Sequence, residues 1–573
     1  MRHLLAVFCL LACTLSCMAF TIDQRSVVAS SFEKLHLTES RLISLLDPAS
    51  KAKDDDTASC VVCTILVGMS EQYADIHHEN IDDFIMKEFC TLFPAEITAA
   101  CNYVIKLVGP SIIHALTETK SGDQVCRKVN LCKNNCTLFT NVKHSEVRLS
   151  SNWAQYVSEG VFAPQKLDTN PLIELLKYLK KVGDTKVPLV DNDGDHYSPS
   201  MALARGYHWR GRDCNDLDAK IHPGRSVDPY PGQAVDYNCN GISGKDPETG
   251  KDWKEVLCAN TNEMGVIVIG DSAGIFAQIP NEFATAADWN KTTFANIIPT
   301  WLDQGGHPQF SAYTGYEDEG YHGPVHSVYK YLLERNRCNF RDYQNVAVSG
   351  AASGGTYDNA QLMNRNQTTD KPLLVIMELA ANDVCFGQGT APEDFRKNIL
   401  RILDWLDTVL PAGSHLVSIG LVNGSVVHDI MGTRTHPMGM PFNDFYDYLN
   451  CVGVDLCENY LTSNVTHIQQ TVAKAMALNK VYEEIFSNYT AKNYDFVHYD
   501  FPAAWVIEKW TSQGGDPFDL ISHVDGFHPS QIFNMLLGDY LWENIMKDHP
   551  EWIGPVNPNN DRIKQLFGDQ GGY

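Results

Sequence analysis

The chain has 573 residues, more than one hydrophobic core can organise, so several domains are expected. Its formal charge of −25 argues against a nucleic-acid-binding protein, because such proteins gather Lys and Arg on one surface. After the first 20 residues no run of 18 apolar residues occurs, which argues against a membrane span in the mature chain.

Residues 1–22 are typical of a secretory signal peptide, with an early charge, an apolar stretch and small residues before the expected cleavage point. Residues 23–56 form an N-terminal segment that suits a propeptide. Three of the 17 cysteines leave with the signal, and the even number that remains predicts disulfides. Six glycosylation sequons fit the same oxidising route, at Asn135, Asn290, Asn366, Asn423, Asn464 and Asn488. We therefore expect a secreted protein, or one in the lumen of endolysosomal or other cytoplasmic vesicles.

Residues 57–137 combine helical periodicity with closely spaced cysteines. Six lie in this stretch, at Cys60, Cys63, Cys90, Cys101, Cys126 and Cys132. A zinc site at the first pair is disfavoured, because no second Cys-x-x-Cys or paired histidines follow and the compartment is oxidising. The first two cysteines are one helical turn apart and can meet two others near the end of a last helix. The pattern predicts an all-α module stapled by disulfides, which a small domain needs.

This six-cysteine pattern resembles the saposin B-type domain. The resemblance implies a nested order of disulfides, Cys60–Cys132, Cys63–Cys126 and Cys90–Cys101. It also implies amphipathic helices that open over acyl chains, and so peripheral contact with a lipid or membrane surface. The alternative is a folding module that makes no lipid contact.

Residues 138–165 are polar and poorly periodic, which predicts an exposed linker that a protease can cut. Cys136 lies just outside the six-cysteine module and makes an even set with the seven cysteines of the later chain. One disulfide from Cys136 to the later domain is therefore expected. A cut linker would then give two chains joined by that interchain disulfide.

Residues 166–250 contain an unusual density of aspartates. Asp191, Asp193 and Asp195 alternate around a glycine, so that short carboxylates can converge on one hard cation. Such a density is costly without a bound cation, and a solvated acidic loop is the alternative. An EF-hand is excluded because residue 202, its twelfth position, is alanine.

The segment resembles an aspartate-rich calcium motif that is repeated in some extracellular proteins. The resemblance implies structural calcium with ligands at Asp191, Asp193, Asp195, Tyr197 (through its backbone carbonyl), Asp213, Asp216, Asp218, Asp236, Asn238 and Asn240. It also implies a disulfide between Cys214 and Cys239. His196 stands where the motif usually has glycine, and a long insert separates its two parts, so the number of ions stays open.

Residues 251–573 hold the strongest catalytic candidate, Ser272. It lies in the run GVIVIGDSAGIF, which is typical of a buried strand that ends at a polar turn. A strand end or the start of a helix would explain that run without any catalysis. A nucleophilic serine further needs a base, an acid that orients the base, and donors for the oxyanion.

Candidates for these companions follow later in the same domain. The apolar strands within YQNVAVSG and KPLLVIMELAAND end at Gly350 and at Asn382. Asp525 and His528 stand just before an amphipathic helix. Each position alone has a plain structural explanation, as a turn, a cap or a helix start. Because the carboxyl ends of parallel strands meet at one edge of a sheet, the set is expected to converge.

The set GDS, G, AND and DxxH resembles the SGNH or GDSL-type hydrolases. The resemblance implies an α/β/α three-layer domain with a parallel sheet. It makes Ser272 the nucleophile, His528 the general base and Asp525 the orienting acid. The backbone N–H groups of Ser272 and Gly350 and the side chain of Asn382 would form the oxyanion hole. Alanine replaces the usual leucine after GDS, which removes no chemical group.

The order of the three modules resembles the acyloxyacyl hydrolases. This resemblance implies a multidomain enzyme that removes secondary, acyloxyacyl-linked fatty acyl chains from the lipid A of lipopolysaccharide through a Ser-His-Asp acyl-enzyme mechanism, and so detoxifies it. A broader phospholipase or esterase on glycerophospholipids is one alternative, because a triad does not distinguish ester classes. A lipid-binding or lipid-transfer protein on a hydrolase scaffold is the other, and the complete triad argues against it.

Overall fold

The computed structural model describes residues 56–93, 95–119, 121–139, 149–159, 185–201, 204–295, 300, 303, 305–454 and 456–573. The expected signal peptide at 1–22 lies outside these residues, as does nearly all of the segment at 23–56. Within the described part of the chain, no helix is both long and apolar enough to cross a membrane.

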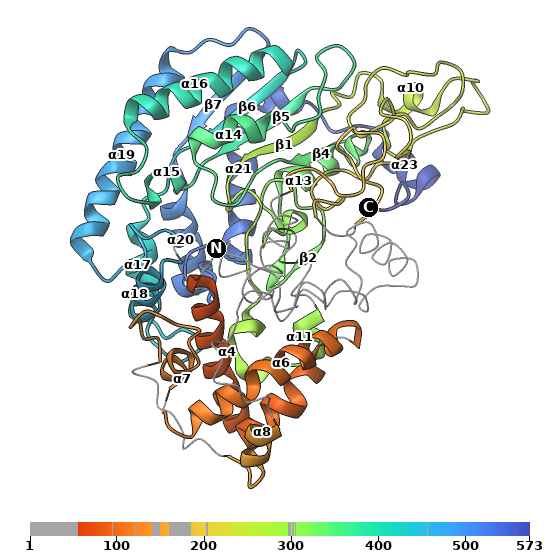
Figure 1. Ribbon diagram of the computed structural model, residues 1–573. Helices are drawn as coiled ribbons and strands as arrows, with labels where there is room; N and C mark the ends of the chain where they lie inside the picture. Colours follow the sequence, from red (N-terminus) through yellow and green to blue (C-terminus); the bar gives the residue numbers. More distant parts are fainter. Residues whose placement is uncertain are drawn as a thin grey trace.

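Helices form the N-terminal part of the described chain, at the lower end of Figure 1. They are α4 (Asp56–His77), α5 (Ile81–Asp83), η1 (Phe84–Glu88), η2 (Phe89–Leu92), α6 (Ala95–Leu116), α7 (Gly122–Lys128) and α8 (Trp153–Glu159). Three disulfides hold this domain, and they are the pairs that the saposin resemblance implied: Cys60–Cys132, Cys63–Cys126 and Cys90–Cys101. The first two join α4 to α7 and to the turn after it, so they staple the two ends of the helical domain together.

Part of the segment expected to be an exposed linker, 138–165, packs against this domain. Ser150 is buried, and its N–H and hydroxyl donate to the carboxylate of Asp82 over 2.8 and 2.5 Å. Tyr156 of α8 donates to Asp83 over 2.7 Å. These acceptors explain why a polar stretch is ordered here. Within this linker the protease cut is expected near Arg148 to Ser151, and of these residues Ser150 is buried. Residues 140–148 and 160–165 lie outside the described residues.

Aromatic side chains join the helical domain to the rest of the chain. Phe93 packs against Phe294 of α11 (Lys291–Ala295), with ring centroids 4.5 Å apart. Phe89 lies 6.1 Å from Trp289, centroid to centroid. All four rings are buried. The helical domain is therefore docked on the C-terminal domain through an apolar contact. Figure 1 shows α11 at the edge of the helical domain, where it contacts η2.

Cys136 forms the expected disulfide to the later chain, and its partner is Cys451 in α18 (Phe442–Val452). The two cysteines are 315 residues apart in the sequence. A hydrogen bond crosses between the same two domains, from the Gln72 side chain to the backbone oxygen of Met438 over 2.8 Å. The docking thus has a covalent and a polar component as well as the aromatic one.

Five parallel strands form the centre of the C-terminal domain, with the order β4-β1-β5-β6-β7 across the sheet. They are β1 (Gly265–Gly270), β4 (Tyr343–Asn345), β5 (Leu373–Glu378), β6 (Ser414–Ile419) and β7 (Tyr494–Tyr499). β1 and β5 pair in register up to Gly270 and Glu378, the last residue of each. Both strands are buried along their whole length, as the near-continuous apolar runs of their sequences predict.

Alternate residues of the strands face two separate cores. Ile267 and Val375 belong to one core, which α14, α16 and α19 cover. Val266 and Ile376 belong to the other, which α13, α20 and α21 cover. The helices are α13 (Val328–Arg335), α14 (Ser353–Ala360), α16 (Pro392–Val409), α19 (Val465–Asn488), α20 (Ala503–Ser512) and α21 (Gln531–Asp548). The domain is a three-layer α/β/α sandwich, so the expected fold class is confirmed.

Shorter elements complete the described C-terminal half and mostly form its loops. They are α10 (Trp253–Cys258), η3 (Asn281–Ala284), η4 (Ala286–Asp288), η5 (Pro308–Phe310), β2 (Glu319–Gly320), β3 (Gly323–Pro324), η6 (Arg337–Asn339), α15 (Asn382–Cys385), α17 (Ser425–Met431), η7 (Pro517–Leu520), α22 (Pro550–Ile553) and α23 (Asn560–Phe567). The strands β2 and β3 make a small antiparallel hairpin outside the main sheet.

The aspartate-rich segment lies along the outer edge of strand β4. The N–H of Gly211 donates to the oxygen of Tyr343 over 2.9 Å, and the N–H of Asn345 donates to the oxygen of Trp209 over 2.7 Å. Glycine is required for this approach, because a Cβ at Gly211 would lie 1.6 Å from the backbone oxygen of Arg341. The segment thereby covers an edge strand whose backbone groups would otherwise be unpaired.

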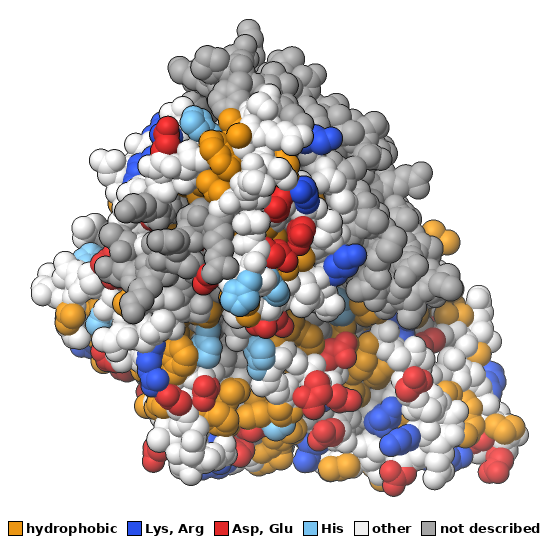
Figure 2. All heavy atoms as spheres, turned by 90° about the horizontal axis from the view of Figure 1, so that it is seen from below, with side chains coloured by type: hydrophobic (Ala, Val, Ile, Leu, Met, Phe, Trp, Pro, Cys, Tyr) orange, Lys and Arg blue, Asp and Glu red, His pale blue; other side chains and the backbone are white. Residues whose placement is uncertain are grey.

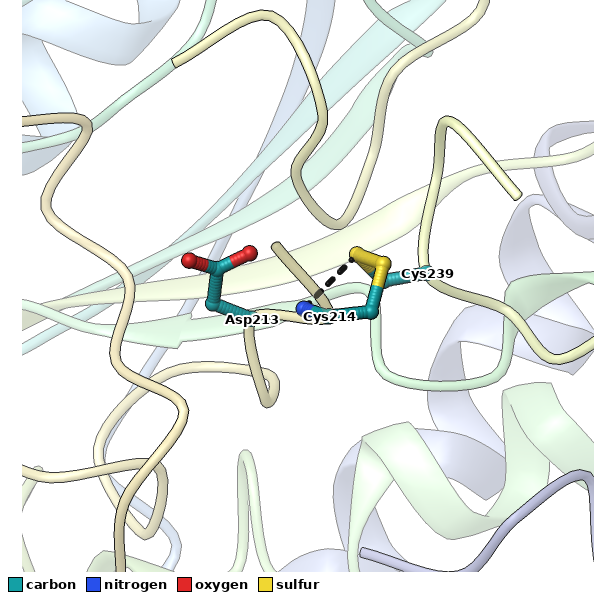
Figure 3. Close-up of side chains that lie close together, drawn as sticks. All are labelled: Asp213, Cys214 and Cys239. Atoms are coloured by element: carbon teal, nitrogen blue, oxygen red, sulfur yellow. Dashed lines mark hydrogen bonds between the residues drawn. A yellow bond between two sulfur atoms is a disulfide. The ribbon is translucent and has the colours of Figure 1, made fainter. Parts of the chain in front are cut away.

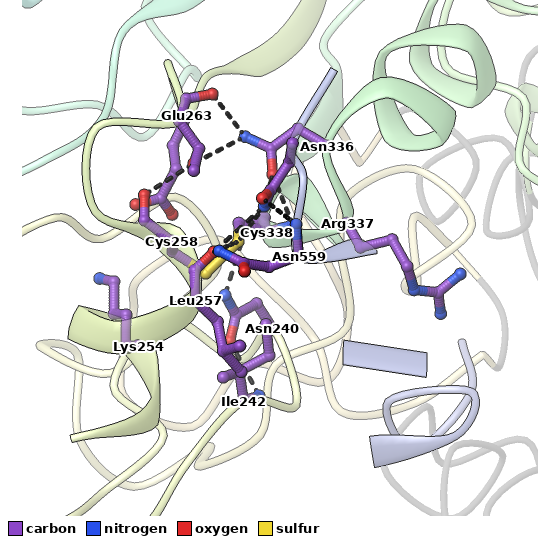
Figure 4. The surroundings of a disulfide bond; sticks show 12 residues. Asn240, Ile242, Lys254, Leu257, Cys258, Glu263, Asn336, Arg337, Cys338 and Asn559 are labelled. Atoms are coloured by element: carbon purple, nitrogen blue, oxygen red, sulfur yellow. Dashed lines mark hydrogen bonds between the residues drawn. A yellow bond between two sulfur atoms is a disulfide. The ribbon is translucent and has the colours of Figure 1, made fainter. Parts of the chain in front are cut away.

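Three more disulfides stabilise the C-terminal half: Cys214–Cys239, Cys258–Cys338 and Cys385–Cys457. Figure 4 shows the surroundings of the second, which joins α10 to η6. Asn240 donates to the backbone oxygen of Cys338 over 3.2 Å, and Asn559 donates to that of Leu257 over 3.0 Å. The end of the aspartate-rich segment is therefore hydrogen-bonded to the C-terminal domain beside this disulfide.

Candidate active site

Ser272 lies in a tight turn directly after β1. Its backbone oxygen accepts a hydrogen bond from the N–H of Ala277 over 2.8 Å. The preceding side chain, Asp271, accepts one from the N–H of Ala273 over 2.9 Å. Turns therefore follow the strand in place of a regular helix. Ser272 is 7 % exposed, so its hydroxyl is close to the surface but shielded from bulk water.

His528 and Asp525 form a buried hydrogen-bonded pair. Nδ1 of His528 lies 2.7 Å from Oδ2 of Asp525. The other carboxylate oxygen accepts from the backbone N–H groups of Phe527 and His528 over 2.9 and 3.0 Å. Burial alone would raise the pKa of Asp525, but the histidine and these amides outweigh it and lower that pKa. Asp525 is therefore a carboxylate that orients the imidazole and leaves Nε2 as its basic nitrogen.

The loop that carries this pair is held by its neighbours. Gly526 has a φ of +63°, and a Cβ there would lie 2.5 Å from Phe442 and from the hydroxyl of Tyr446. That hydroxyl donates to the backbone oxygen of Gly526 over 2.6 Å. Nε2 of His436 lies 2.9 Å from the backbone oxygen of Val524. The glycine of DGFH is thus a backbone requirement of the loop that positions His528.

Asn382 is the first residue of α15, after the end of β5. Its Nδ2 donates to Oδ2 of Asp271 over 2.7 Å, and the N–H of Ala380 donates to the same oxygen over 3.1 Å. A side-chain amide has two N–H hydrogens, so the second one can serve a bound oxyanion. The structure therefore brings Asn382 to the turn of Ser272, as the sequence predicts.

Gly350 lies on the other side of the Ser272 turn. The N–H of Val348 donates to the oxygen of Gly270 over 3.1 Å, so the β4 ladder continues to within two residues of Gly350. Gly350 itself is exposed, with a φ of +75°, and it is not among the described residues that line the pocket at Ser272. Its role in the oxyanion hole stays a prediction.

Ser272, Asn382 and His528 line one pocket. Apart from these residues and Asp271, the described wall is apolar. It includes Val426 and Ile430 of α17, Ile507 of α20 and Phe533 of α21, together with Val422 and Phe501 from the chain just before α17 and α20. The open volume is about 70 Å³, little more than the space of two water molecules. The site thus places a serine hydroxyl, an imidazole and a side-chain amide beside a surface that suits an alkyl chain.

Five aspartates of the acidic segment come together in two groups that share Asp193. Asp191, Asp193 and Asp195 form one group, and Asp193, Asp213 and Asp216 form the other, with the ligand oxygens of each group within 4.8 Å of one another. One oxygen of Asp193, of Asp195 and of Asp213 is buried without a hydrogen-bond partner. Such orphaned carboxylate oxygens fit a bound cation, so these residues can hold a metal ion.

The pKa shifts of these aspartates also favour a bound cation. Burial raises the pKa of Asp195 to about 8, and the neighbouring carboxylates add to the effect. Burial likewise raises the pKa of Asp213 to about 7. Without a cation, the ionised forms of these carboxylates are therefore disfavoured by the fold.

A third group of potential ligands, Asp213, Cys214 and Cys239, is not a metal site (Figure 3). The two cysteines form a disulfide, the one that the calcium motif implied, and therefore offer no thiolate. The N–H of Cys214 donates to Sγ of Cys239 over 3.1 Å.

The other expected side-chain ligands do not belong to the two aspartate groups, although the backbone N–H of Asp218 faces the carboxylate of Asp193. Asp218 accepts from the hydroxyl of Tyr230 over 2.6 Å. Asp236 accepts from the N–H of Gly241 over 2.8 Å, in a turn that also contains the buried Asn238 and Asn240. These residues stabilise turns of the segment, and their role as metal ligands stays a prediction.

Tyr197 and His196 follow the first aspartates. Tyr197 is buried, and its N–H donates to Asp195 over 2.8 Å. His196 has a φ of +71°, the left-handed region that favours glycine. The histidine thus adopts a backbone conformation that a glycine would adopt without strain.

All six sequon asparagines are exposed: Asn135, Asn290, Asn366, Asn423, Asn464 and Asn488. Exposure is what attachment of a glycan requires.

Sequence patterns assign no role to two carboxyl groups beneath the site, Asp271 and Glu378. Asp271 contacts Asn382, as described above. Glu378 ends the strand LLVIME and is completely buried. An acidic residue inside an otherwise apolar strand is the signal that could have drawn attention to it, because such residues are almost never fully buried without a partner.

Two family models match the chain: a saposin-like domain over residues 59–181 and a GDSL-like lipase/acylhydrolase over residues 266–541. The acyloxyacyl hydrolase of Oryctolagus cuniculus is 33 % identical to this chain over 568 residues, which are 93 % of the chain and 98 % of that relative. The chain belongs to the acyloxyacyl hydrolase family. The Homo sapiens relative is 33 % identical over 567 residues, 93 % of this chain and 97 % of its own length. The Mus musculus relative is 33 % identical over 543 residues, 90 % and 93 % of the two lengths.

Membership in this family confirms the resemblance read from the module order. The protein is an esterase-type hydrolase that combines a saposin-like domain with a GDSL-like domain. The saposin-like match continues to residue 181, past the expected boundary at 137, and residues 160–181 lie outside the described residues.

The Ser272→Ala variant is expected to lose all reaction with a fluorophosphonate probe, because only an activated serine displaces fluoride from the probe's phosphorus. Labelling is measured on gels by fluorescence. The exposed Ser512→Ala variant is the matched control and should label like the wild type. If Ser272→Ala were still labelled, another residue would be the nucleophile.

Proposed function

We propose that this enzyme removes the secondary, acyloxyacyl-linked fatty acyl chains from the lipid A of lipopolysaccharide and so detoxifies it. The pocket in which Ser272, Asn382 and His528 face an apolar wall carries this proposal. An ester carbonyl held at these three side chains directs its acyl chain toward that wall. Relatives named acyloxyacyl hydrolase that align with nearly the whole chain support the choice of ester.

In the proposed reaction, Nε2 of His528 accepts the proton of Ser272 while Oγ bonds to the carbonyl carbon of the ester. The carbonyl oxygen becomes an oxyanion, for which the N–H groups of Ser272 and Gly350 and the amide of Asn382 are the proposed donors. The ester C–O bond then breaks, and the hydroxyl of the primary acyl chain leaves with the proton from His528. Water, deprotonated by His528, cleaves the acyl-enzyme and releases the fatty acid. Asp525 stabilises the imidazolium in both steps.

The saposin-like domain is proposed to cover the remaining acyl chains of the substrate. Its apolar contact with the catalytic domain, Phe93 against Phe294, holds the two domains side by side. The end of the molecule seen in Figure 2 carries hydrophobic side chains among acidic and histidine side chains, a mixture that suits an amphiphile. Peripheral contact with a lipid surface belongs to the same proposal.

A glycerophospholipid is the second candidate substrate. The same triad and apolar wall act on any carboxylic ester of a fatty acid, so the site geometry also supports it. A lipid-transfer protein without catalysis is less well supported, because the Asp525–His528 pair is intact at 2.7 Å.

Purified lipopolysaccharide incubated with the wild-type enzyme should release free fatty acid, and the Ser272→Ala variant should release less than about one thousandth as much, given the size of triad effects.

The Ile430→Trp variant should slow the release of long chains by about 10- to 100-fold, because overpacking the pocket wall costs about 1–3 kcal/mol. The same variant should hydrolyse a butyrate ester almost normally. Met476→Trp, on an exposed position of α19, is the matched control. Fatty acids are quantified by mass spectrometry, and release from phospholipid but not from lipopolysaccharide would favour the second candidate.

We further propose that the metal ion is calcium and that it is structural. Carboxylate oxygens are the ligands that calcium prefers. None of the five grouped aspartates lines the pocket at Ser272, and the segment that contains them covers the edge strand β4. A cation there stabilises the segment without taking part in ester cleavage.

Chelation with EGTA is expected to lower the melting temperature by about 5–10 °C, the shift that several kcal/mol of lost binding energy produces in a domain of this size. Added calcium should restore it. Asp193→Asn should start from the lower melting temperature and no longer respond to EGTA, whereas the exposed Asp429→Asn should behave like the wild type. Immediate loss of ester cleavage on chelation, with the fold intact, would contradict a structural role.

Secretion, or delivery to the lumen of endolysosomal vesicles, is proposed on the basis of seven disulfides among the described residues. In such a compartment, a protease that cuts the chain between residues 140 and 148 would leave two chains joined by Cys136–Cys451.

Denaturing electrophoresis of cut enzyme should therefore show one band without reductant and two bands with it. Cys136→Ser and Cys451→Ser should each release the smaller chain without reductant, because each removes one end of the same disulfide. Cys385→Ser breaks a disulfide within the larger chain and is the control that should not release it. Two bands from unreduced, cut wild type would contradict the proposed linkage.

A further inference from the structure

A buried carboxyl group lies directly beneath the candidate active site. Glu378 is the last residue of β5 and has no exposed surface. Its Oε2 lies over Gly270, so that a Cβ at that glycine would be only 3.2 Å from it. Gly270 is paired with Glu378 in the sheet and immediately precedes Asp271. Glu378 thus lies where the Ser272 turn and the Asn382 turn leave the sheet.

Asp271 connects those two turns. Its Oδ1 accepts from the N–H of Ala273 in the Ser272 turn over 2.9 Å. Its Oδ2 accepts from the N–H of Ala380 over 3.1 Å and from Nδ2 of Asn382 over 2.7 Å. One carboxylate therefore sets the distance between the nucleophile and the amide that is to bind the oxyanion. Three N–H donors favour its ionised form.

Glu378 has no such support. The backbone amides of Gly274 and Ala380 face its carboxyl group, but neither oxygen completes a hydrogen bond. Two buried carboxyl groups side by side do not both ionise, and the one with more donors keeps the charge. The single proton of the pair therefore resides on Glu378.

The pKa directions agree with this assignment. Burial raises the pKa of Glu378 well above its usual range, and the charge of Asp271 adds to the rise. Burial raises the pKa of Asp271 to about 6, against the effect of its hydrogen bonds and of His528. The other ionisable groups that face the pair are the buried phenols of Tyr313 and Tyr482.

We propose that Glu378 is a positioning residue for ester hydrolysis, a neutral carboxylic acid that fills the junction of the two turns and keeps Asp271 directed at Asn382. As a neutral acid it also adds no second negative charge below the oxyanion, which such a charge would oppose. A buried carboxyl group with unsatisfied oxygens destabilises a fold, so its place here calls for a functional reason. The inference rests on the proposed roles of Ser272 and Asn382, but it holds for any ester cleaved there.

The test measures kcat, KM and melting temperature with the soluble ester p-nitrophenyl butyrate. Glu378→Gln keeps the size and neutrality of the acid, so kcat should stay within about threefold of the wild type, a small effect beside the 10²-fold cost of a misplaced catalytic group. Glu378→Met removes both polar atoms at similar volume. Its melting temperature should rise, because no polar group is left unsatisfied, while kcat falls about 10- to 100-fold at unchanged KM as the two turns lose their spacing. A residue with only a structural role would not move stability and turnover in opposite directions.

The link from Asp271 to Asn382 is tested by a double-mutant cycle on the same ester. Asp271→Asn and Asn382→Ala should each lower kcat by about 10²–10³, the range for one lost oxyanion donor. The double variant should lose no more than either single variant, because both changes remove the same donor. This cycle can be measured even if the Glu378→Met variant does not fold, because it does not use that variant.

Three results would overturn the inference: Glu378→Gln below one hundredth of wild-type kcat at an unchanged melting temperature, Glu378→Met with normal kcat, or additive losses in the cycle. A different result would refute the proposed substrate. Wild-type enzyme that cleaves the soluble ester but releases no fatty acid from lipopolysaccharide would refute lipid A as the substrate, and the positioning test would keep its meaning.

Discussion

The in-register pairing of β1 with β5 is the constraint on which the active site depends. It places the last residues of the two strands, Gly270 and Glu378, side by side. The turns that follow carry Ser272 and Asn382, so the proposed nucleophile and the proposed oxyanion donor line the same pocket. A shift of one residue along either strand would turn every side chain to the opposite face and separate these groups. The loop of Asp525 and His528, locked at Gly526, completes the set from the chain before α21.

Buried carboxyl groups lie close together in two parts of this molecule, and their negative charge is reduced in a different way in each. At the catalytic edge, one proton on Glu378 leaves a single charge on Asp271, which three N–H groups hold. In the aspartate-rich segment five carboxylates crowd together with too few donors, so a cation is the natural solution. The formal charge of −25 therefore overstates the field that a negatively charged lipid would meet.

The docking of the saposin-like domain gives the chain its organisation as one enzyme. An aromatic contact, a hydrogen bond from Gln72 and the Cys136–Cys451 disulfide act between the same two domains. Residues 149–159 add to the helical domain because Asp82 and Asp83 accept their hydrogen bonds. This arrangement fixes the saposin-like domain on the domain that carries Ser272, as the proposed sharing of one amphiphile between the two domains requires.

Sequence by itself determined the six-cysteine helical module, the buried strands and the residues of the DxxH loop, because helical period, apolar runs and short motif spacings are local properties of a chain. The tertiary structure alone decided that Cys136 pairs with Cys451, that five of the expected calcium ligands meet while the carboxylates of Asp218 and Asp236 accept hydrogen bonds within turns, and that Gly350 lies outside the described pocket wall. It also decided that Glu378 lies beneath Asp271. Such contacts join residues that are distant in the sequence, and their distances follow from strand register and domain docking, which no local pattern of residues encodes.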